Sequence, residues 1–362
     1  MKILFIAAHF APSLGGVENY VFNVALGLKQ TYAAEVVVVT ANAKGKGLLI
    51  ENYQGLKVYR LSAMLHVSNT PINPLWYFSL KSIIREEKPD IINSHQPVAF
   101  LGDLAACVVG KIPFVLTYHA GTMKKKKLPF DILIALYEAF VFPHTAKKAT
   151  RIICVSQFVR ATFLKRYASK VTIISPGVNT SLYKPNPEVK REENLVLFIA
   201  RYKKMYEMKG LYYLIPAINM LEGVKLRIVG EIGESTAQNI EFVGVKQGPE
   251  LVEEIQKASV LVLSSLAHME SFGMVLIEAM ACETPVVGTN IGGIPEVIND
   301  GCDGFIVASR DSNALALAIS KIVSDKDLAA RMGHAGAAKV RENFTWDTRV
   351  ALTERVFESC LQ

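Results

Sequence analysis

Short runs of β-branched and other apolar residues recur along the chain, separated by segments with helical spacing. The run Ile3–Ala8 is followed by Gly15-Gly16, then by a segment with apolar positions three and four residues apart, then by the run Val36–Thr40. This order predicts two parallel strands joined by a crossover helix. Further strands are predicted in the first half at Lys57–Leu61, Asp90–Asn93, Phe114–Tyr118, Arg151–Val155 and Val171–Ile174.

The same alternation starts again in the second half of the chain. Residues 176–193 are rich in proline, asparagine and charge, which is typical of a linker. Strands are then predicted at Leu195–Ala200, Lys225–Val229, Ile240–Val243, Val260–Leu263, Pro285–Val287 and Gly304–Val307. We therefore predict an α/β protein with two Rossmann-like, doubly wound domains, at residues 1–175 and 194–344, facing each other across a cleft. Residues 345–362 have helical spacing and form a last helix.

The composition agrees with two packed domains and excludes several classes of protein. With 362 residues, 51% of them hydrophobic and 20% charged, the chain has material for two cores and no sign of disorder. The five cysteines form no C-x-x-C pair, which argues against a disulfide framework or a zinc ribbon and favours the cytoplasm. The opening apolar run is short and predicts a buried strand, and no window reaches the roughly 20 apolar residues of a membrane span.

Charge is divided unevenly between the two halves. Residues 1–180 hold 21 basic and 9 acidic side chains, whereas residues 181–362 hold 19 and 24. The first domain is therefore expected to face an anionic partner such as lipid or a phosphorylated substrate. Lys124, Lys125, Lys126 and Lys127 precede the apolar stretch 132–142, which suits either docking on an anionic membrane or a solvated loop before a core helix.

Two carboxylates flank the start of a predicted helix in the second domain. Glu270 lies just before a helix that is predicted to begin near Phe272, and Glu278 lies about two turns inside it, roughly 11 to 12 Å along its axis. The backbone N–H groups of residues 271–275 then line a helix N-terminus, which favours anions. By themselves the two carboxylates have two interpretations. They could bind hydroxyl groups at the two ends of one ligand, or Glu270 could be a capping acid and Glu278 a solvated helix residue.

The stretch from Glu270 to Glu278 closely resembles the E-x7-E motif of glycosyltransferase family 4, a family of nucleotide-sugar enzymes with the GT-B fold. The resemblance covers nearly the whole chain and is most specific in the second domain. Other segments similar to that family are Gly15–Glu18, Cys154–Ser156, Pro176–Asn179, Pro285–Glu296 and Asp303–Val307.

The resemblance implies a donor site in the second domain. Glu278 would bind the ribose hydroxyls and Glu270 the donor hexose. The backbone of the next five residues would help to hold the sugar and phosphates: Ser271, Phe272, Gly273, Met274 and Val275. Arg201 and Lys209 resemble the cations that clamp the pyrophosphate. Their spacing is about three residues longer than usual, so Lys203 or Lys204 are alternatives to Lys209.

In the first domain the resemblance points to a glycine pair and a histidine. Gly15 and Gly16 would let the backbone approach the donor phosphates. His119, which ends the strand Phe114–Tyr118, is similar to the family's active-site histidine beside the donor sugar. His9 and His95 end other strands of this domain and are weaker candidates for the same cleft. In the GT-B fold the final helix returns to the first domain.

The resemblance also implies the reaction: transfer of a hexosyl group to a hydroxyl acceptor, such as a lipid-linked or cell-envelope glycan, with retention of configuration. An acceptor hydroxyl attacks from the face that the diphosphate leaves, and no covalent intermediate forms. No essential metal is expected, because Arg201 and Lys209 supply the positive charge. Asp325-Lys326-Asp327 matches D-x-D but is predicted to be solvated.

Two alternatives stay open beside the transferase. A GT-B nucleotide-sugar epimerase would act on the donor without an acceptor, and a two-lobed solute-binding protein would share the hinged α/β lobes. No aromatic and basic module for nucleic acid is visible in the sequence.

Overall fold

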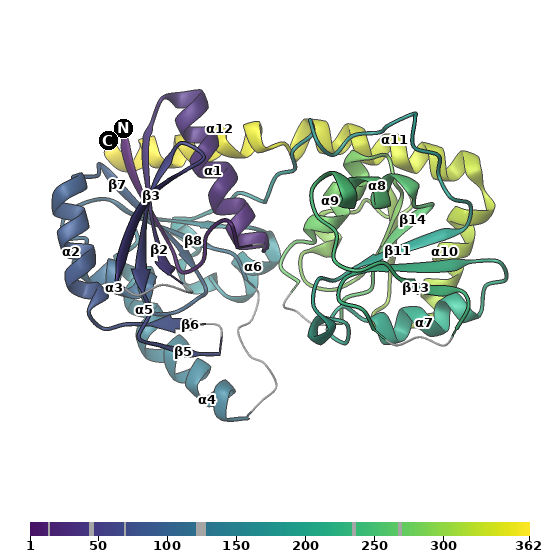
Figure 1. Cartoon of the computed structure of the whole chain (residues 1–362), viewed down its shortest axis with the longest axis horizontal. Coiled ribbons are helices and arrows are strands. Elements are labelled where there is room, and N and C mark those ends of the chain that lie inside the picture. Colours follow the sequence, from purple (N-terminus) through teal and green to yellow (C-terminus); the bar gives the residue numbers. More distant parts are fainter. Residues whose placement is uncertain (14, 43–46, 69, 121–127, 234–236, 267–269) are drawn as a thin grey trace. The chain divides into compact units, whose positions relative to one another are not determined.

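The computed structural model describes residues 1–13, 15–42, 47–68, 70–120, 128–233, 237–266 and 270–362. The chain divides into two compact units, one formed by Met1–Pro176 with Trp346–Gln362, the other by Gly177–Thr345. Each unit is built on one large, mainly parallel sheet with helices on both faces, as Figure 1 shows for each in turn. The predicted α/β class is thus confirmed.

The sheet of the first unit has eight strands in the order β10-β9-β8-β7-β1-β2-β4-β3. All neighbours are parallel except β3 and β4. Their bounds are β1 (Lys2–Ala7), β2 (Glu35–Asn42), β3 (Leu48–Tyr53), β4 (Leu56–Ser62), β7 (Ile91–Gln96), β8 (Phe114–Tyr118), β9 (Arg151–Cys154) and β10 (Val171–Ile173). Every strand predicted in this half is present. The edge strand β3 and the hairpin of β5 (Leu65–Val67) and β6 (Thr70–Ile72) were not predicted.

Helices pack on both faces of this sheet. The helices of this unit are α1 (Gly16–Tyr32), α2 (Trp76–Glu87), α3 (Leu101–Val108), α4 (Leu128–Leu136), the π-helix η1 (Tyr137–Val141), α5 (Phe142–Lys148), α6 (Gln157–Thr162) and the 3-10 helix η2 (Lys165–Lys170), and no side chain of α4 or η1 is buried. Alternate residues of β1 separate two cores: Leu4 and Ile6 face α2, α3 and α5, whereas Ile3 and Phe5 face α1.

The last helix, α12 (Trp346–Leu361), completes the core on the α1 face. Gly27 of α1 has no side chain at the point where Val350 of α12 approaches, and a Cβ there would lie 2.5 Å from Val350 Cγ2. Phe357 is fully buried, and its ring meets that of Phe5 edge to face. Trp346 reaches the ring of Tyr20 in the same way, at 5.6 Å between centroids. The close contact between α1 and α12 therefore covers this face of the sheet.

The sheet of the second unit has six strands, all parallel, in the order β13-β12-β11-β14-β15-β16. The strands are β11 (Leu195–Ile199), β12 (Lys225–Val229), β13 (Ile240–Phe242), β14 (Val260–Leu263), β15 (Val286–Thr289) and β16 (Gly304–Val307), each at a predicted position. The helices are η3 (Lys203–Met205), α7 (Leu211–Asn219), α8 (Pro249–Lys257), α9 (Met274–Ala281), η4 (Ile294–Glu296), α10 (Ser312–Ser324) and α11 (Lys326–Asn343).

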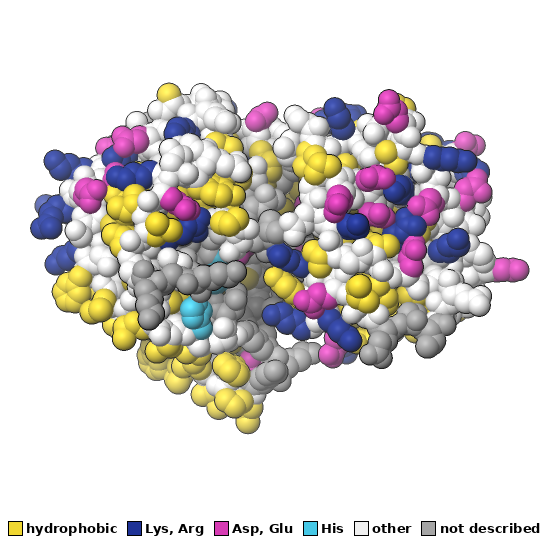
Figure 2. All heavy atoms as spheres, in the orientation of Figure 1, with side chains coloured by type: hydrophobic (Ala, Val, Ile, Leu, Met, Phe, Trp, Pro, Cys, Tyr) yellow, Lys and Arg dark blue, Asp and Glu magenta, His cyan; other side chains and the backbone are white. Residues whose placement is uncertain are grey.

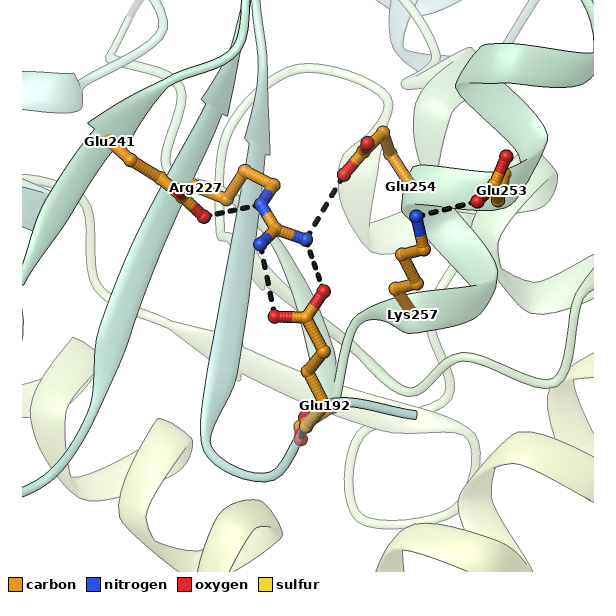
Figure 3. Close-up of polar contacts among 7 residues, drawn as sticks. Glu192, Arg227, Glu241, Glu253, Glu254 and Lys257 are labelled. Carbon is orange, nitrogen blue, oxygen red and sulfur yellow. Dashed lines mark hydrogen bonds and ion pairs between the residues drawn. The ribbon is translucent and has the colours of Figure 1, made fainter. Parts of the chain in front are cut away.

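An arginine holds part of the predicted linker, residues 176–193, to the second unit. Arg227 of β12 donates to both carboxylate oxygens of Glu192, at 2.6 and 2.9 Å, and also contacts Glu254 of α8 at 3.2 Å (Figure 3). At the other end of the segment, the Val178 N–H donates to the Phe344 carbonyl at 2.8 Å. Residues 177–193 therefore belong to the second unit, rather than forming a free connection.

Candidate functional site

The loop after β11 places Lys209 at the carboxyl edge of the second sheet. Its short helix η3 and the buried ring of Tyr206, which packs on Phe198 and Phe242, fix the path of this long loop. Gly210 ends the loop with φ +74°, and a Cβ there would lie 1.9 Å from the Ser264 carbonyl oxygen. The Ser264 hydroxyl donates to the Lys209 carbonyl at 2.9 Å. The loop thus lies directly against the chain that leaves β14.

Glu270 lies beside Lys209. The Lys209 Nζ is 3.8 Å from Glu270 Oε2, and the two side chains are only 20% and 19% exposed. The Ser265 hydroxyl also donates to Glu270 Oε2, at 3.4 Å. A partly buried cation and carboxylate thus meet where parallel α/β sheets bind their ligands.

Two glycines support Glu270 from the loop after β15. The Gly293 N–H donates to the Glu270 carbonyl at 3.0 Å. Gly292 has φ +60°, and a Cβ there would lie 1.9 Å from the same carbonyl oxygen. Gly292 and Gly293 belong to the segment Pro285–Glu296, which resembles the family. Their physical role is to allow close backbone contact with the Glu270 carbonyl.

The helix between the two glutamates starts later than predicted. It begins at Met274, after Gly273 with φ +98°, so Glu278 is its fifth residue, about one turn inside. The predicted start near Phe272 and the axial distance of two turns are therefore wrong. The Phe272 side chain is buried against Phe344, at 5.6 Å between ring centroids. Only the backbone at this position is available to a ligand, while Ser271, Met274 and Val275 are partly exposed.

Glu278 has an unusual electrostatic environment. Burial raises its pKa to about 7, and the positive charge of Lys209 opposes this rise. In turn, Glu278 adds to the effect of burial in raising the pKa of Tyr183, and of Cys282, which reaches about 12. Lys209 therefore acts electrostatically on both glutamates of the E-x7-E motif.

The alternative lysines have other surroundings. Lys203 and Lys204 are exposed, and the backbone N–H of Lys203 donates to the Glu231 carboxylate at 2.8 Å. The Lys204 ammonium lies 5.1 Å from the ring centroid of Tyr202, whose ring is also 5.2 Å from the guanidinium carbon of the partly exposed Arg201. Of the three lysines, Lys209 is the one with a described contact to the glutamate pair.

In the first unit, His119 follows β8 and is buried beside a second histidine. His95 Nδ1 and His119 Nε2 are 2.9 Å apart, and the two ring planes differ by 15°. Burial lowers the pKa of His119 to about 3 and places that of His95 well below its usual value, with His119 contributing. The rings of Tyr20 and His119 meet edge to face, with 4.7 Å between their centroids. His95 was a weak candidate in sequence, and its link to His119 was not predicted.

The glycine pair lies at the start of α1 in the same unit. Gly15 is extended and exposed, and α1 begins at the exposed Gly16. A Cβ on Gly15 would lie 2.2 Å from Glu18 Oε2, so the Glu18 carboxylate folds back over this glycine. His9, in the loop after β1, is partly exposed.

The remaining candidates have simpler explanations or cannot be placed. Asp325 caps α11 by accepting from the Leu328 N–H at 2.8 Å, so the D-x-D match marks a helix start. In the ranges that the structure describes, no three His, Cys, Asp or Glu side chains gather as a metal site would require. Lys124 to Lys127 lie outside the described residues. No helix in the described part of the chain is both long and apolar enough to cross a membrane.

An exposed apolar surface follows those lysines. None of the side chains of α4 and η1 is buried, and the well-exposed apolar ones include Leu128, Ile132, Leu133, Leu136 and Phe140. Figure 2 shows hydrophobic side chains gathered over this part of the first unit. Of the two interpretations of this segment, a core helix is contradicted up to Val141, because no side chain of α4 or η1 is buried.

Comparison with known proteins gives consistent matches along the chain. Residues 180–339 match the family described as glycosyl transferases group 1, and residues 14–182 match glycosyltransferase family 4. An uncharacterized glycosyltransferase of Methanocaldococcus jannaschii is 27% identical, over 99% of this chain and 98% of its own. A phosphatidyl-myo-inositol mannosyltransferase of Mycolicibacterium smegmatis is 26% identical, over 99% and 94%. The crystal structure of HepE from Anabaena with UDP-glucose has a TM-score of 0.77 at 19% identity, covering 99% of this chain and all of that one (100%).

Proposed function

The chain belongs to glycosyltransferase family 4 and has the GT-B fold, and on this basis we propose which bonds it makes and breaks. It moves a hexosyl group from a UDP- or GDP-linked sugar to a hydroxyl acceptor. The observation that carries the proposal is the position of Lys209, 3.8 Å from Glu270 and electrostatically coupled to Glu278. A cation beside one carboxylate and close enough to a second to lower its pKa suits a ligand that carries both a diphosphate and hydroxyl groups.

In this assignment each side chain recognises one part of the donor. Lys209 and Arg201 bind the diphosphate, Glu278 accepts from the ribose hydroxyls, and Glu270 accepts from the hexose. The backbone of residues 271–275 contributes N–H groups at the start of α9. The family-like histidine, His119, contacts the sugar, and Gly15-Gly16 lies near the phosphates. HepE, solved with UDP-glucose, supports a nucleotide-sugar donor.

The proposed reaction retains the anomeric configuration. The acceptor oxygen forms its bond to the anomeric carbon on the face from which the diphosphate oxygen departs. The acceptor proton passes to the departing diphosphate, so that atoms and charge balance. Lys209 and Arg201 stabilise the negative charge that develops on the leaving group, and no covalent enzyme intermediate is needed. We propose that turnover requires no added metal, because these cations supply the charge.

The acceptor is proposed to be a lipid-linked or cell-envelope glycan presented at a membrane. The exposed apolar side chains of α4 and η1 support this assignment, because their burial in lipid is favourable. The name of the mycobacterial relative, a phosphatidyl-myo-inositol mannosyltransferase, agrees with a lipid acceptor. The chain would then bind the surface of an anionic membrane through the first unit, with Lys124 to Lys127 adding charge.

A titration of thermal stability with UDP, GDP, ADP and NAD tests the donor assignment. One nucleoside diphosphate should raise the melting temperature, and Arg201→Ala and Glu278→Ala should abolish that shift. Radiolabelled sugar should then pass from the matching donor to a hydroxyl acceptor in the presence of chelator. No shift with any diphosphate would contradict the donor site, turnover of the donor alone would indicate an epimerase, and loss of all turnover in chelator would contradict metal independence.

A further inference from the structure

Two buried histidines from adjacent parallel strands share a hydrogen bond in the first unit. The register of β7 and β8 pairs His95 with Thr117, which brings His119, two residues further on, beside the His95 ring. The 2.9 Å separation of His95 Nδ1 and His119 Nε2, with ring planes 15° apart, is a hydrogen bond between ring edges. Exactly one of these two nitrogens must carry the proton when both rings are neutral.

The surroundings of the other ring nitrogen of His95, Nε2, indicate which of the two hydrogen-bonded nitrogens donates. His95 Nε2 is buried and has no hydrogen-bond partner among the described residues. If His119 donated, His95 would carry its own proton on Nε2 and bury an N–H without an acceptor. Buried unpaired N–H groups are rarer in native proteins than buried unpaired acceptors. The favoured arrangement therefore has His95 Nδ1–H donating to His119 Nε2.

We propose that His95 is a positioning residue, which holds His119 in the tautomer with its proton on Nδ1. His119 then presents an N–H donor, and not a lone pair, to a hydroxyl oxygen of the donor sugar. This inference rests on the proposed function, in which His119 contacts that sugar. It goes further by assigning the direction of the hydrogen bond and the residue that fixes it.

The surroundings keep both rings neutral and in place. Phe5 stacks on His95 at 5.4 Å between centroids, and the rings of Tyr20 and His119 meet edge to face. Burial lowers the pKa values of both histidines, so neither is charged near neutral pH. Among the described residues, the titratable groups recorded near the two histidines are Tyr20 on α1 and, beside Tyr20, Cys154 on β9 and Arg349 on α12.

Nitrogen-15 NMR of the histidine rings reads the tautomer directly in the full-length protein. His95 and His119 signals are assigned by comparison with single variants of each, and both rings should show the proton on Nδ1 between pH 6 and 8. Because this measurement needs no substrate, it tests the tautomer even if His119 has no part in catalysis. A proton on Nε2 of His119 would overturn the inference.

Two substitutions of His95 separate hydrogen bonding from packing. His95→Asn keeps an N–H near the position of Nδ1, whereas His95→Phe keeps the aromatic ring and loses the donor. We expect His95→Phe to lower kcat about 10- to 100-fold and His95→Asn to stay within about threefold of wild type. Affinity for the nucleoside diphosphate alone should not change in either, which also shows that both variants fold.

A higher kcat in His95→Phe than in His95→Asn would contradict the proposal. If His95 only fills space, His95→Phe is the better tolerated substitution. Wild-type turnover in His119→Ala would instead refute the sugar contact in the proposed function. Failure of the tautomer inference and failure of the sugar contact are distinguishable. The first appears in the two His95 variants and in the NMR spectrum, and the second appears only in the activity of His119→Ala.

Discussion

The ammonium of Lys209 and the carboxylate of Glu270 lie 3.8 Å apart, although 60 positions separate them in the chain. Two contacts bring them together: Gly210 lets the loop after β11 touch Ser264, and the Gly293 N–H binds the Glu270 carbonyl. The pair is therefore fixed by backbone on both sides. A ligand that binds Lys209 therefore meets a side chain whose backbone is already held in place.

Removing the Lys209 charge should abolish recognition of the diphosphate. We expect Lys209→Met to lose the thermal stabilisation by the preferred nucleoside diphosphate and to lower kcat about 100-fold or more, since one fixed charge at a developing anion is lost. Lys203→Met and Lys204→Met are matched controls in the same loop and should behave as wild type. An equal loss in Lys203→Met would place the phosphate contact at Lys203 instead.

Glu278 should make stability depend on pH between about 4.5 and about 7. Its pKa is higher in the folded chain, so the unfolded chain releases the proton first and stability falls as pH rises through this window. In Glu278→Gln this fall disappears, and the variant should gain about 1 to 3 kcal/mol relative to wild type between pH 4.5 and pH 8. Denaturant unfolding without ligand measures the difference, and parallel pH profiles would contradict the raised pKa.

Gly292→Ala should damage the site through a clash with backbone. Gly301→Ala is the control, because Gly301 has φ +77° with nothing within 4 Å of a Cβ, whereas Gly292 has φ +60° and the Glu270 carbonyl at 1.9 Å. Both variants should lose about 1 kcal/mol from left-handed strain, and Gly292→Ala about 1 to 3 kcal/mol more. Only Gly292→Ala should reduce kcat. Similar unfolding curves and activities for the two would show that the loop adjusts.

The Arg227 cluster in Figure 3 should contribute to stability at neutral pH. Arg227 is 13% exposed, and Arg227→Met leaves three carboxylates close together, with an expected loss of about 1 to 3 kcal/mol. Arg227 lowers the pKa of Glu192, so this contribution is present above the unfolded value of about 4.5 and is lost as pH falls below it.

A control for this prediction is the ion pair of Glu193, the residue next to Glu192, with Lys326. Lys326 contacts Glu193 at 2.6 Å but is 83% exposed, so Lys326→Met should not change the unfolding curve. Equal effects of Arg227→Met and Lys326→Met would show that burial does not distinguish the two ion pairs.

The apolar surface of α4 and η1 should mediate binding to anionic vesicles. Replacing Ile132 and Phe140 by aspartate should weaken sedimentation with phosphatidylglycerol vesicles at least about tenfold, since two side chains can no longer enter lipid. Ile232→Asp is the control, because that side chain is 73% exposed on the second unit. Equal sedimentation of all three proteins would contradict the membrane assignment.

The sequence was sufficient to locate the central strands, because buried parallel strands are continuous apolar runs. It did not locate β3, whose side chains are mostly exposed at the sheet edge, so that its pairing with β4 gives no local pattern. The start of α9 was misplaced by two residues because the conformation of Gly273, with φ +98°, depends on its packing. Edges and helix ends were set by contacts outside each segment.

For the site, the spacing of Glu270 and Glu278 left two interpretations open, and the resemblance to the family singled out both carboxylates and Lys209 as candidates. The proposal of Lys209 rather than Lys203 or Lys204 for the phosphate contact rests on the path of the loop through η3, which depends on the burial of Tyr206. The hydrogen bond between His95 and His119 depends on strand register across 24 residues. No local pattern in either segment could indicate it.

The division of the chain determines which unit can be completed first during synthesis. The chain leaves the first unit after Pro176 and returns at Trp346, so the second unit is a contiguous insertion whose ends are joined by the Val178 and Phe344 hydrogen bond. The first unit is discontinuous, and its core lacks Phe357 until α12 has been made. Although synthesis of the first unit starts first, its fold is completed last. The inserted unit can fold before α12 of the first unit has been synthesised.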